Sequence, residues 1–514
     1  MLLLAALCVL AISGVHCADA QSVQQPAISA SNSTDAFAAR VEALRDTAAA
    51  AKAHWGIFVA DAATGKTLYD LNSGQFFTPA STTKLFTTAL ALAKLGPDYR
   101  FRTTLESAAK PDSHERLKGD LFLVGRSAPD LTNRRYPYDP HLDREGAPER
   151  ILAEMVDALV AQGVRRIDGD IVVDDSAFED RPYPRGWDIE DVKYDFGAPV
   201  TALVINDNIF FTDLSPAFAV GAKARADLAP PLADLYVDNA VVTGARHGEP
   251  RIRIVWQLGS QTVRLAGSIP LGGKTQTLAV ANPSPCEYAA RLLRFLLLQR
   301  GIKISGQARV LEAPQESPPA PQGPRNVLVE HLSPPLSEIV TMTNKNSENL
   351  YAELLLRAVA YAATGFGSLD AGLQIEQDFL RQAGVPVEEV ALADGSGLSH
   401  GNLVTPAATV ALLRYAATQP WGADYRASLP IAGEDGTLSM QMKNTPAAGR
   451  VQAKTGTLEH SKAIAGYTTA LSGRALVFAM FASQYSMTTH DAMATLDGIC
   501  AAMVEEIPAA GNSN

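Results

Sequence analysis

Several features are scarce in this sequence, and each scarcity excludes a class of protein. The 514 residues include 4 cysteines, too few for a scaffold built on disulfides. Lys and Arg number 44 against 55 Asp and Glu, and the net charge of −11 disfavours binding to nucleic acid. The apolar stretch at 2–13 is shorter than the roughly 20 residues of a membrane-spanning helix. With 47% hydrophobic residues, the chain is expected to form two or three globular domains.

Motifs for nucleotide and zinc chemistry are also missing. Gly65-Lys66-Thr67 and Gly273-Lys274-Thr275 resemble the end of a phosphate-binding loop, but the glycine required five residues earlier is replaced by Ala60 or Ser268. The 9 histidines contain no His-Glu-x-x-His pair. The sequence therefore predicts neither a nucleotide-binding protein nor a zinc peptidase.

The first twenty residues predict export. The apolar run at 2–13 is followed by Ala18-Asp19-Ala20, a small-x-small cleavage site, so 1–20 is interpreted as a signal peptide and the mature protein as periplasmic or extracytoplasmic. Cys17 leaves a lipoprotein open as an alternative, and a retained anchor is a third. Cleavage leaves Cys286 and Cys500, which could form a disulfide or lie buried apart.

Apolar periodicity along the chain is typical of an α+β protein. Helices are expected at 35–53, 81–95, 149–162, 286–300, 349–363, 369–383 and 488–506. Strands are expected at 55–61, 66–71, 119–124, 166–173, 240–242, 251–258, 261–265, 450–457, 463–471 and 475–483. This order suits an antiparallel sheet covered by its terminal helices, with a helical partner layer and a β-rich insertion at about 101–281.

Ser81 and Lys84 stand three residues apart at the start of the predicted helix 81–95, on one helix face. A buried lysine with a partly neutral amine can accept the serine proton, which would make Ser81 a nucleophile. Taken alone the pattern is weak, because a serine at this position also caps helices.

Two later motifs change this assessment. Ser347-Glu348-Asn349 opens the predicted helix 349–363, and Lys454-Thr455-Gly456-Thr457 lies on a predicted strand, where glycine admits a ligand and lysine can bind a carboxylate. A helix cap and a strand end explain each motif equally well in isolation. Ser-x-x-Lys, Ser-x-Asn and Lys-Thr-Gly in this order are specific for penicillin-binding proteins and serine β-lactamases.

Over about 36–505 the sequence resembles the class C low-molecular-mass penicillin-binding proteins. These are the D-alanyl-D-alanine carboxypeptidase/endopeptidases of peptidase family S13, the penicillin-binding protein 4 type. Glu348 stands where the family more often has Asp. Beyond the three motifs, the resemblance is carried by 394–399 (Asp-Gly-Ser-Gly-Leu-Ser), Asn402, Thr405-Pro406, 119–121, 173–178, 197–199 and 206–208.

The resemblance implies a discontinuous α+β domain of the serine transpeptidase/β-lactamase type at 34–98 and 280–508. β-rich inserted domains would interrupt it, with domain II at 99–200 and 262–279 and domain III at 201–261. It also implies that Ser81 attacks the carbonyl of the penultimate D-alanine, or of a D-alanyl cross-link to a diamino acid.

The implied roles of the other motif residues follow the family pattern. Lys84 would be the base, Ser347 would relay a proton to the leaving amine, and Asn349 would hold Lys84 and the substrate amide. Backbone N–H groups of Ser81 and Thr457 would form an oxyanion hole. The substrate carboxylate would bind along Lys454, Thr455 and Gly456.

The resemblance also suggests a specificity residue and the ligands. Asp191 would help to position the peptide stem, although a solvated acidic turn with Asp188 and Glu190 explains it equally well. Peptidoglycan stem peptides and β-lactams are the implied ligands, with no metal or organic cofactor. Two other functions stay open, a serine β-lactamase and a non-catalytic peptidoglycan-binding or penicillin-sensing protein. The large insertion argues against the first, and the three intact motifs argue against the second.

Overall fold

The computed structural model describes residues 30–509 except 258 and 312–322. The predicted signal peptide at 1–20, with Cys17, lies outside these residues. Within the described part, no helix has the length and apolar character needed to cross a membrane.

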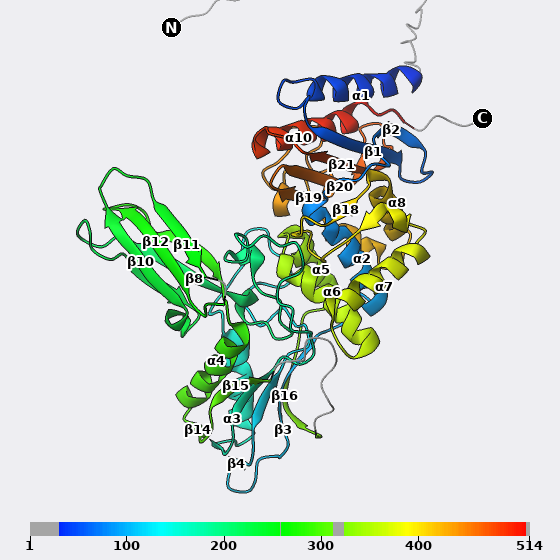
Figure 1. Ribbon diagram of the computed structural model, residues 1–514. Coiled ribbons are helices and arrows are strands. Elements are labelled where there is room, and N and C mark those ends of the chain that lie inside the picture. Colours follow the sequence, from blue (N-terminus) through cyan, green and yellow to red (C-terminus); the bar gives the residue numbers. More distant parts are fainter. Residues whose placement is uncertain (1–29, 258, 312–322, 510–514) are drawn as a thin grey trace, which may run out of the picture.

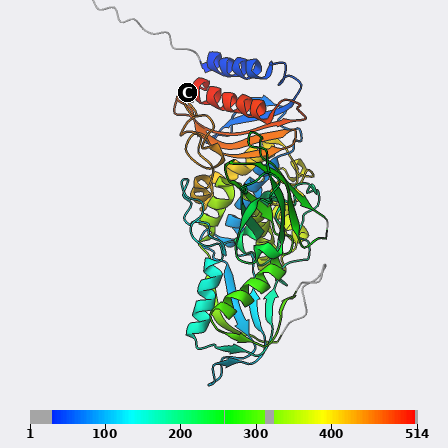
Figure 2. The same ribbon diagram turned by 90° about the vertical axis from the view of Figure 1, so that its left-hand side faces the viewer.

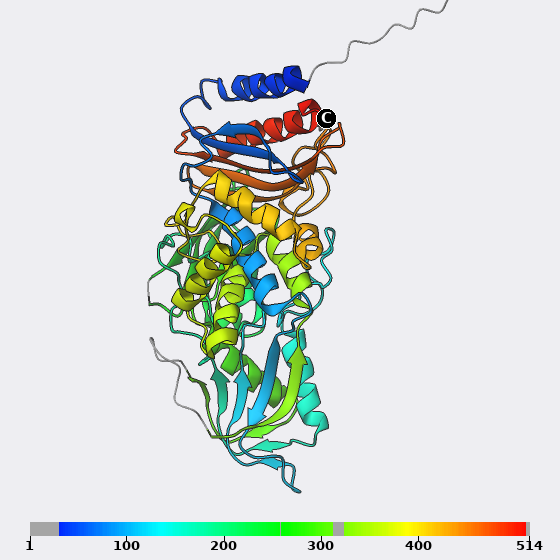
Figure 3. The same cartoon turned by 90° about the vertical axis from the view of Figure 1, so that its right-hand side faces the viewer.

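The two ends of the chain meet in one antiparallel sheet of order β19-β20-β21-β1-β2 (Figure 1). β1 pairs with β21 along its whole length, so His54 lies opposite Ser483. Helices α1 (Ala30–Arg45) and α10 (Thr489–Glu506) pack together over one face of this sheet (Figure 3). The strands are β1 (His54–Asp61), β2 (Thr67–Leu71), β19 (Gln452–Leu458), β20 (Ser461–Thr469) and β21 (Ala475–Ser483).

A layer of helices lies on the other face of the sheet and surrounds α2 (Lys84–Leu95). Every residue from Lys84 to Leu92 is buried, which explains why the sequence of α2 is apolar on almost all sides. The predicted helix 81–95 begins as a 3₁₀ turn, η1 (Ala80–Thr83), before α2. The surrounding helices are α5 (Leu336–Lys345), α6 (Asn349–Thr364), α7 (Leu369–Gln382), α8 (Pro406–Ala417) and α9 (Gly422–Ala427).

A second five-stranded sheet, of order β15-β7-β5-β3-β16, lies at the far end of the molecule (Figure 1). Helices α3 (Arg150–Ala161) and α4 (Pro285–Gln299) belong to this domain. Its strands are β3 (Arg102–Ser107), β5 (Leu121–Val124), β7 (Ile171–Asp174), β15 (Ala308–Leu311) and β16 (Asn326–Leu332), with short flanking strands β4 (Arg116–Leu117), β6 (Arg166–Ile167) and β14 (Lys303–Ile304).

This pairing corrects the expected return to the first domain at residue 280. β15 pairs with β7 and β16 pairs with β3, so the segment from α4 to β16 belongs to the second domain. In the sequence, the domain boundary was expected at residue 280 because helical periodicity returns there, at α4. Periodicity does not reveal which sheet a helix covers, because that depends on pairings between distant segments.

Two three-stranded sheets form the third part, and one of them extends away from the body as an arm, which faces the viewer in Figure 2. β12 pairs with β10 and β11, and β13 pairs with β8. The segment 262–279 therefore belongs with 201–261 rather than with domain II as expected. The strands are β8 (Ile209–Ser215), β9 (Arg225–Ala229), β10 (Val237–Gly244), β11 (Arg251–Trp256), β12 (Val263–Pro270) and β13 (Gln276–Ala281).

Short elements complete the described chain. Cys286 in α4 and Cys500 in α10 are buried in different domains, and no disulfide joins them. The short elements are β17 (Val390–Ala391), β18 (Leu403–Val404), η2 (Asp195–Gly197), η3 (Asn206–Asn208), η4 (Ala233–Leu235), η5 (Val387–Glu389) and η6 (Gly436–Leu438).

Candidate active site

The 3₁₀ turn η1 brings Ser81 and Lys84 together at the start of the buried helix α2. Ala80 has a left-handed φ of 47°, which is uncommon outside glycine. Gly397 packs directly against it, and a Cβ at Gly397 would lie 1.9 Å from the Ala80 carbonyl oxygen. Within this tight turn, the Lys84 Nζ lies 2.9 Å from the Ser81 Oγ.

Lys84 is fully buried, and its amine contacts two carbonyl oxygens in addition to Ser81. The Asn349 Oδ1 on α6 and the Ser396 backbone oxygen each lie 2.6 Å from the Lys84 Nζ. Burial lowers the pKa of Lys84 to about 7, although the carboxylates of Asp394, Glu353 and Glu348 act in the opposite direction. The amine is therefore partly neutral near pH 7.

A second buried lysine lies beside Ser347. The Lys454 Nζ donates one hydrogen bond of 2.9 Å to the Ser347 Oγ and another of 2.8 Å to the backbone oxygen of Thr455, the next residue along the strand. Burial, followed by the charges of Lys84 and Lys462, holds the pKa of Lys454 well below its usual value. Ser347 has a left-handed φ of 62°, a conformation that favours glycine.

Gly456 lets strand β19 pass close to the turn that carries Ser81. A Cβ at this position would lie 2.5 Å from the Pro79 oxygen and 3.0 Å from the Ser81 nitrogen. The hydroxyls on either side of Gly456 are also held, since Thr455 bonds Thr437 at 2.8 Å and Lys462 donates to Thr457 at 2.6 Å. The backbone of β19 therefore runs alongside the Ser81 amide.

A cleft of about 570 Å³ opens onto these residues. Its lining includes residues of the first domain and Asp191 and Phe196 of the insertion. The Phe196 oxygen accepts a hydrogen bond of 2.8 Å from the Asn349 Nδ2, which joins the insertion to the second motif. Of the residues predicted from sequence, Ser81, Ser347, Asn349, Thr455, Thr457 and Asp191 line the cleft, while Lys84 and Lys454 are fully buried at contact distance from Ser81 and Ser347.

Asp191 shares the cleft with Asp188 and His400. Burial raises the pKa of Asp191, Asp188 raises it further, and His400 and Lys193 oppose the rise. Across the described residues, no group of three or more His, Cys, Asp or Glu side chains is placed to hold a metal ion.

Glu353, a buried carboxylate near Lys84, could not be assigned from the sequence motifs. Glu353 accepts hydrogen bonds of 2.9 Å from the backbone N–H groups of Gly395 and Ser396, and it pairs with Arg357 at 2.9 Å. The i,i+4 spacing of Glu353 and Arg357 on the predicted helix was the available signal. These contacts fix the loop that presents the Ser396 oxygen to Lys84.

Asp394 holds the rest of that loop. It accepts from the Gly397 N–H at 2.8 Å, the Ser399 N–H at 2.6 Å and the Trp187 indole of the insertion at 2.9 Å. Residues 397–401 have the Gly-x-Ser-x-Gly spacing of a nucleophile elbow. Ser399 is nevertheless fully buried and donates to the Arg185 oxygen at 2.8 Å, so its role here is structural.

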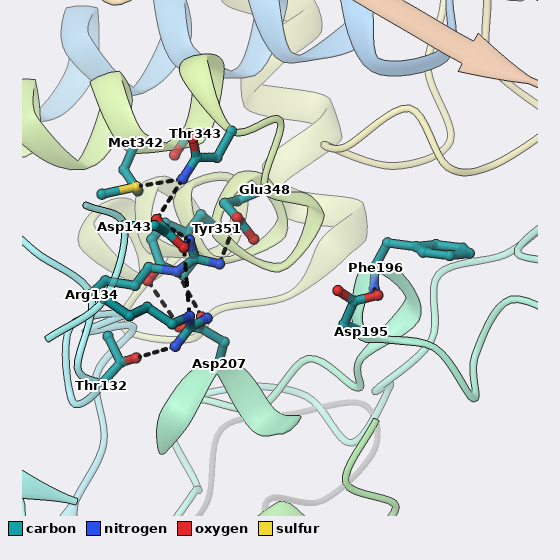
Figure 4. Close-up of polar contacts among 12 residues, drawn as sticks. Thr132, Arg134, Asp143, Asp195, Phe196, Asp207, Met342, Thr343, Glu348 and Tyr351 are labelled. Carbon is teal, nitrogen blue, oxygen red and sulfur yellow. Dashed lines mark hydrogen bonds and ion pairs between the residues drawn. The ribbon is translucent and has the colours of Figure 1, made fainter. Parts of the chain in front are cut away.

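Glu348, the unusual residue of the second motif, contacts an ion network from the insertion (Figure 4). The buried Arg134 lies 2.6 Å from the Glu348 Oε1, and it also pairs with Asp207 at 2.7 Å and Asp143 at 2.9 Å. Burial raises the pKa of Glu348 to about 7, and the charge of Arg134 opposes the rise. The network ties the turn between Ser347 and Asn349 to the inserted domains.

Comparison with known proteins identifies the family of this chain. The model of the D-Ala-D-Ala carboxypeptidase 3 (S13) family matches residues 38–503. The chain belongs to this family. A D-alanyl-D-alanine carboxypeptidase of Actinomadura sp. is 34% identical over 438 residues, which cover 83% of this chain and 77% of the relative. The D-alanyl-D-alanine carboxypeptidase DacB of Haemophilus influenzae is 30% identical over 421 residues, 81% of this chain and 82% of the relative.

The fold agrees with the family. The crystal structure of penicillin-binding protein 4 from Haemophilus influenzae superposes with a TM-score of 0.76 at 26% identity, covering 91% of this chain and 98% of that one. The α+β class predicted from the sequence is confirmed. The predicted enzyme class, a serine-type D-Ala-D-Ala carboxypeptidase of the hydrolases, is confirmed as well.

The Glu353–Arg357 pair makes a testable contribution to stability. Arg357→Met leaves Glu353 buried without its counter-ion. A change of this kind lowers the free energy of unfolding by roughly 3–5 kcal/mol. We expect the midpoint of thermal unfolding to fall by at least about 5 °C. The matched control is Arg150→Met, because Arg150 pairs with Glu154, also four residues away on a helix, and these two side chains are 49% and 59% exposed. That change should cost under about 1 kcal/mol. Equal midpoints for the two variants would contradict the argument.

Proposed function

We propose that this protein is a DD-peptidase that uses Ser81 as its nucleophile on the D-alanyl ends and cross-links of peptidoglycan. The observation that carries the proposal is the contact of the Ser81 hydroxyl with a buried lysine amine whose pKa is lowered to about 7. Ser81 lines the cleft, so a substrate carbonyl can reach its hydroxyl.

The contacts of Lys84 suit a general base. A neutral amine has two N–H groups and one lone pair. The carbonyl oxygens of Asn349 and Ser396 accept hydrogen bonds from the two N–H groups, and the lone pair then faces the Ser81 hydroxyl. Lys84 accepts the proton as the Ser81 Oγ bonds to the D-alanyl carbonyl carbon.

This attack gives a tetrahedral intermediate. Its collapse breaks the amide C–N bond and leaves an ester on Ser81. The proton that Lys84 accepted passes to the leaving amine through Ser347, whose Oγ bonds the Lys454 amine. Water then attacks the ester carbonyl while Lys84 accepts a proton from it, and Lys84 returns this proton to the Ser81 oxygen as the ester C–O bond breaks and the acid is released. The backbone N–H groups of Ser81 and Thr457 serve as the oxyanion hole, which the close approach at Gly456 favours.

The substrate carboxylate binds at Lys454 and Thr455. A buried lysine with a lowered pKa lacks a compensating negative charge. An incoming carboxylate supplies this charge, raises the Lys454 pKa again and forms a charge-assisted hydrogen bond. β-Lactams carry a carboxylate and a reactive carbonyl, so we propose that they bind in the same way. We further propose that the protein acts outside the cytoplasm, with 1–20 as its export signal.

Acylation of Ser81 by benzylpenicillin tests the nucleophile. We expect the intact mass to rise by one drug molecule, with the adduct mapped to the peptide that contains Ser81. Ser81→Ala should form no adduct while keeping its thermal midpoint. An adduct at another residue would sink the assignment, and rapid turnover of the drug without D-alanine release from peptides would favour a β-lactamase.

The pH dependence of acylation tests Lys84 as base. With a pKa of about 7, the neutral fraction of Lys84 rises as the pH increases through 7, from about a tenth at pH 6 to about nine-tenths at pH 8. The acylation rate constant should therefore increase about tenfold over this range and then level off.

The charge-conserving variant Lys84→Arg should acylate at least about 100-fold more slowly at every pH, because guanidinium stays protonated. Lys443→Arg, at an exposed lysine, should behave as wild type. A flat pH profile, or normal acylation of Lys84→Arg, would remove Lys84 from this role.

Asp191 is proposed to select the peptide stem by pairing with a side-chain amine of its diamino acid. Asp191→Asn should lower kcat/KM for peptides with a free side-chain amine by roughly 5- to 30-fold. Acylation by benzylpenicillin, which lacks that amine, should stay near wild type. The control is Glu190→Gln, because the Glu190 side chain is 77% exposed and pairs with Lys193. Equal losses for peptide and penicillin would indicate a structural role instead.

A further inference from the structure

A second pocket of about 610 Å³ adjoins the catalytic cleft on the far side of Ser347. The two cavities share the residues Phe196, Ser347, Asn349 and Thr437. Ser81 lines only the catalytic cleft, while the second pocket is lined by the insertion, by residues 345–350 and by the turn at Gly436. Ser347 and Thr437 therefore form the boundary between two connected compartments.

The boundary residues lie beside the groups that hold the leaving group in the proposed reaction. Ser347 passes a proton to the leaving amine, and Thr437 bonds the Thr455 hydroxyl at 2.8 Å. A leaving group held there extends away from Ser81 toward the second pocket. D-Alanine has only a methyl group to place in that direction, so it leaves a pocket of this size empty. A diamino acid that belongs to another stem peptide has a whole peptide to place.

The walls of the second pocket are polar and suit a peptide. Three cationic residues (Arg134, Arg144, Lys345) and four acidic ones (Asp143, Asp195, Asp207, Glu348) line it. Most of these charges are already paired within the network around Arg134 or, for Lys345, with Asp435 at 2.6 Å.

Asp195 differs from the other charged residues of the wall. Figure 4 shows it across from Arg134 and Glu348, without a contact to either. Its carboxylate accepts a hydrogen bond from the Phe196 N–H at 3.0 Å, and no ion pair of Asp195 is found among the described residues. It can therefore accept hydrogen bonds from peptide N–H or ammonium groups in the second pocket, next to the shared residue Phe196.

We propose that this second pocket binds the leaving stem peptide when the enzyme cuts a cross-link between two peptidoglycan strands. The inference rests on the proposed function and deepens it, because it assigns the two compartments to the two halves of a cross-linked substrate. The catalytic cleft holds the half that acylates Ser81, and the second pocket holds the half that departs.

Filling the second pocket tests the proposal. Ser439 and Pro140 line it and lie outside the catalytic cleft; Ser439 is half-buried and Pro140 is exposed, so a larger side chain can be accommodated at the surface. Ser439→Trp and Pro140→Trp are compared with Ser439→Ala. The substrates are a purified cross-linked muropeptide dimer and a monomeric pentapeptide muropeptide, and benzylpenicillin acylation reports the state of the catalytic cleft.

We expect each Trp variant to lower kcat/KM for the dimer at least tenfold, mostly through KM. Release of D-alanine from the pentapeptide and acylation by penicillin should stay within twofold of wild type, and Ser439→Ala should match wild type throughout. Unchanged dimer cleavage in both Trp variants, or equal loss for dimer and pentapeptide, would overturn the pocket assignment. Wild-type enzyme that releases D-alanine but does not cut the dimer would overturn it too, while leaving the DD-peptidase intact. Failure on both substrates together with no penicillin adduct would overturn the proposed function itself.

Discussion

The buried amine of Lys84 is the constraint on which the arrangement of the site depends. An ammonium or amine enclosed by protein is costly unless each of its hydrogen-bonding positions has a partner. The partners come from three separate parts of the chain: the turn that carries Ser81, the first turn of α6 and the loop that contains Ser396. Satisfying one amine therefore fixes the relative positions of the three elements.

Carboxylates one layer further out keep these partners in place. Glu353 holds the backbone of the Ser396 loop, and Asp394 ties the same loop to Trp187 of the insertion. Both negative charges favour the protonated form of Lys84, while burial favours the neutral form and prevails. The balance leaves an amine that can exchange a proton near neutral pH, which a deeply buried lysine without nearby carboxylates would not do.

The insertion is a structural part of the site rather than an appendage to it. Arg134 contacts Glu348, the middle residue of the second motif. The Phe196 carbonyl oxygen accepts a hydrogen bond from the Asn349 side chain. The inserted domains thus support the turn at Ser347 to Asn349 from one side and contribute to the walls of both cavities.

The sequence by itself determined the local elements and the chemistry. Ser81 and Lys84 are three residues apart, so the turn alone brings them into contact, and apolar periodicity located α2, α6 and α10 within a few residues. The motifs and the family resemblance identified Ser347, Asn349 and Lys454 as candidates. Local spacing sufficed because short-range geometry depends on neighbours in the chain.

Tertiary structure alone decided which distant segments meet. Pairing of β15 with β7 and of β16 with β3 moved a stretch of chain from the first domain to the second, and pairing of β12 with β10 moved another to the third. The Arg134–Glu348 pair and the second pocket likewise depend on contacts across more than 200 residues of sequence. No local pattern encodes them, because strand partners and ion pairs are selected by the packing of whole domains.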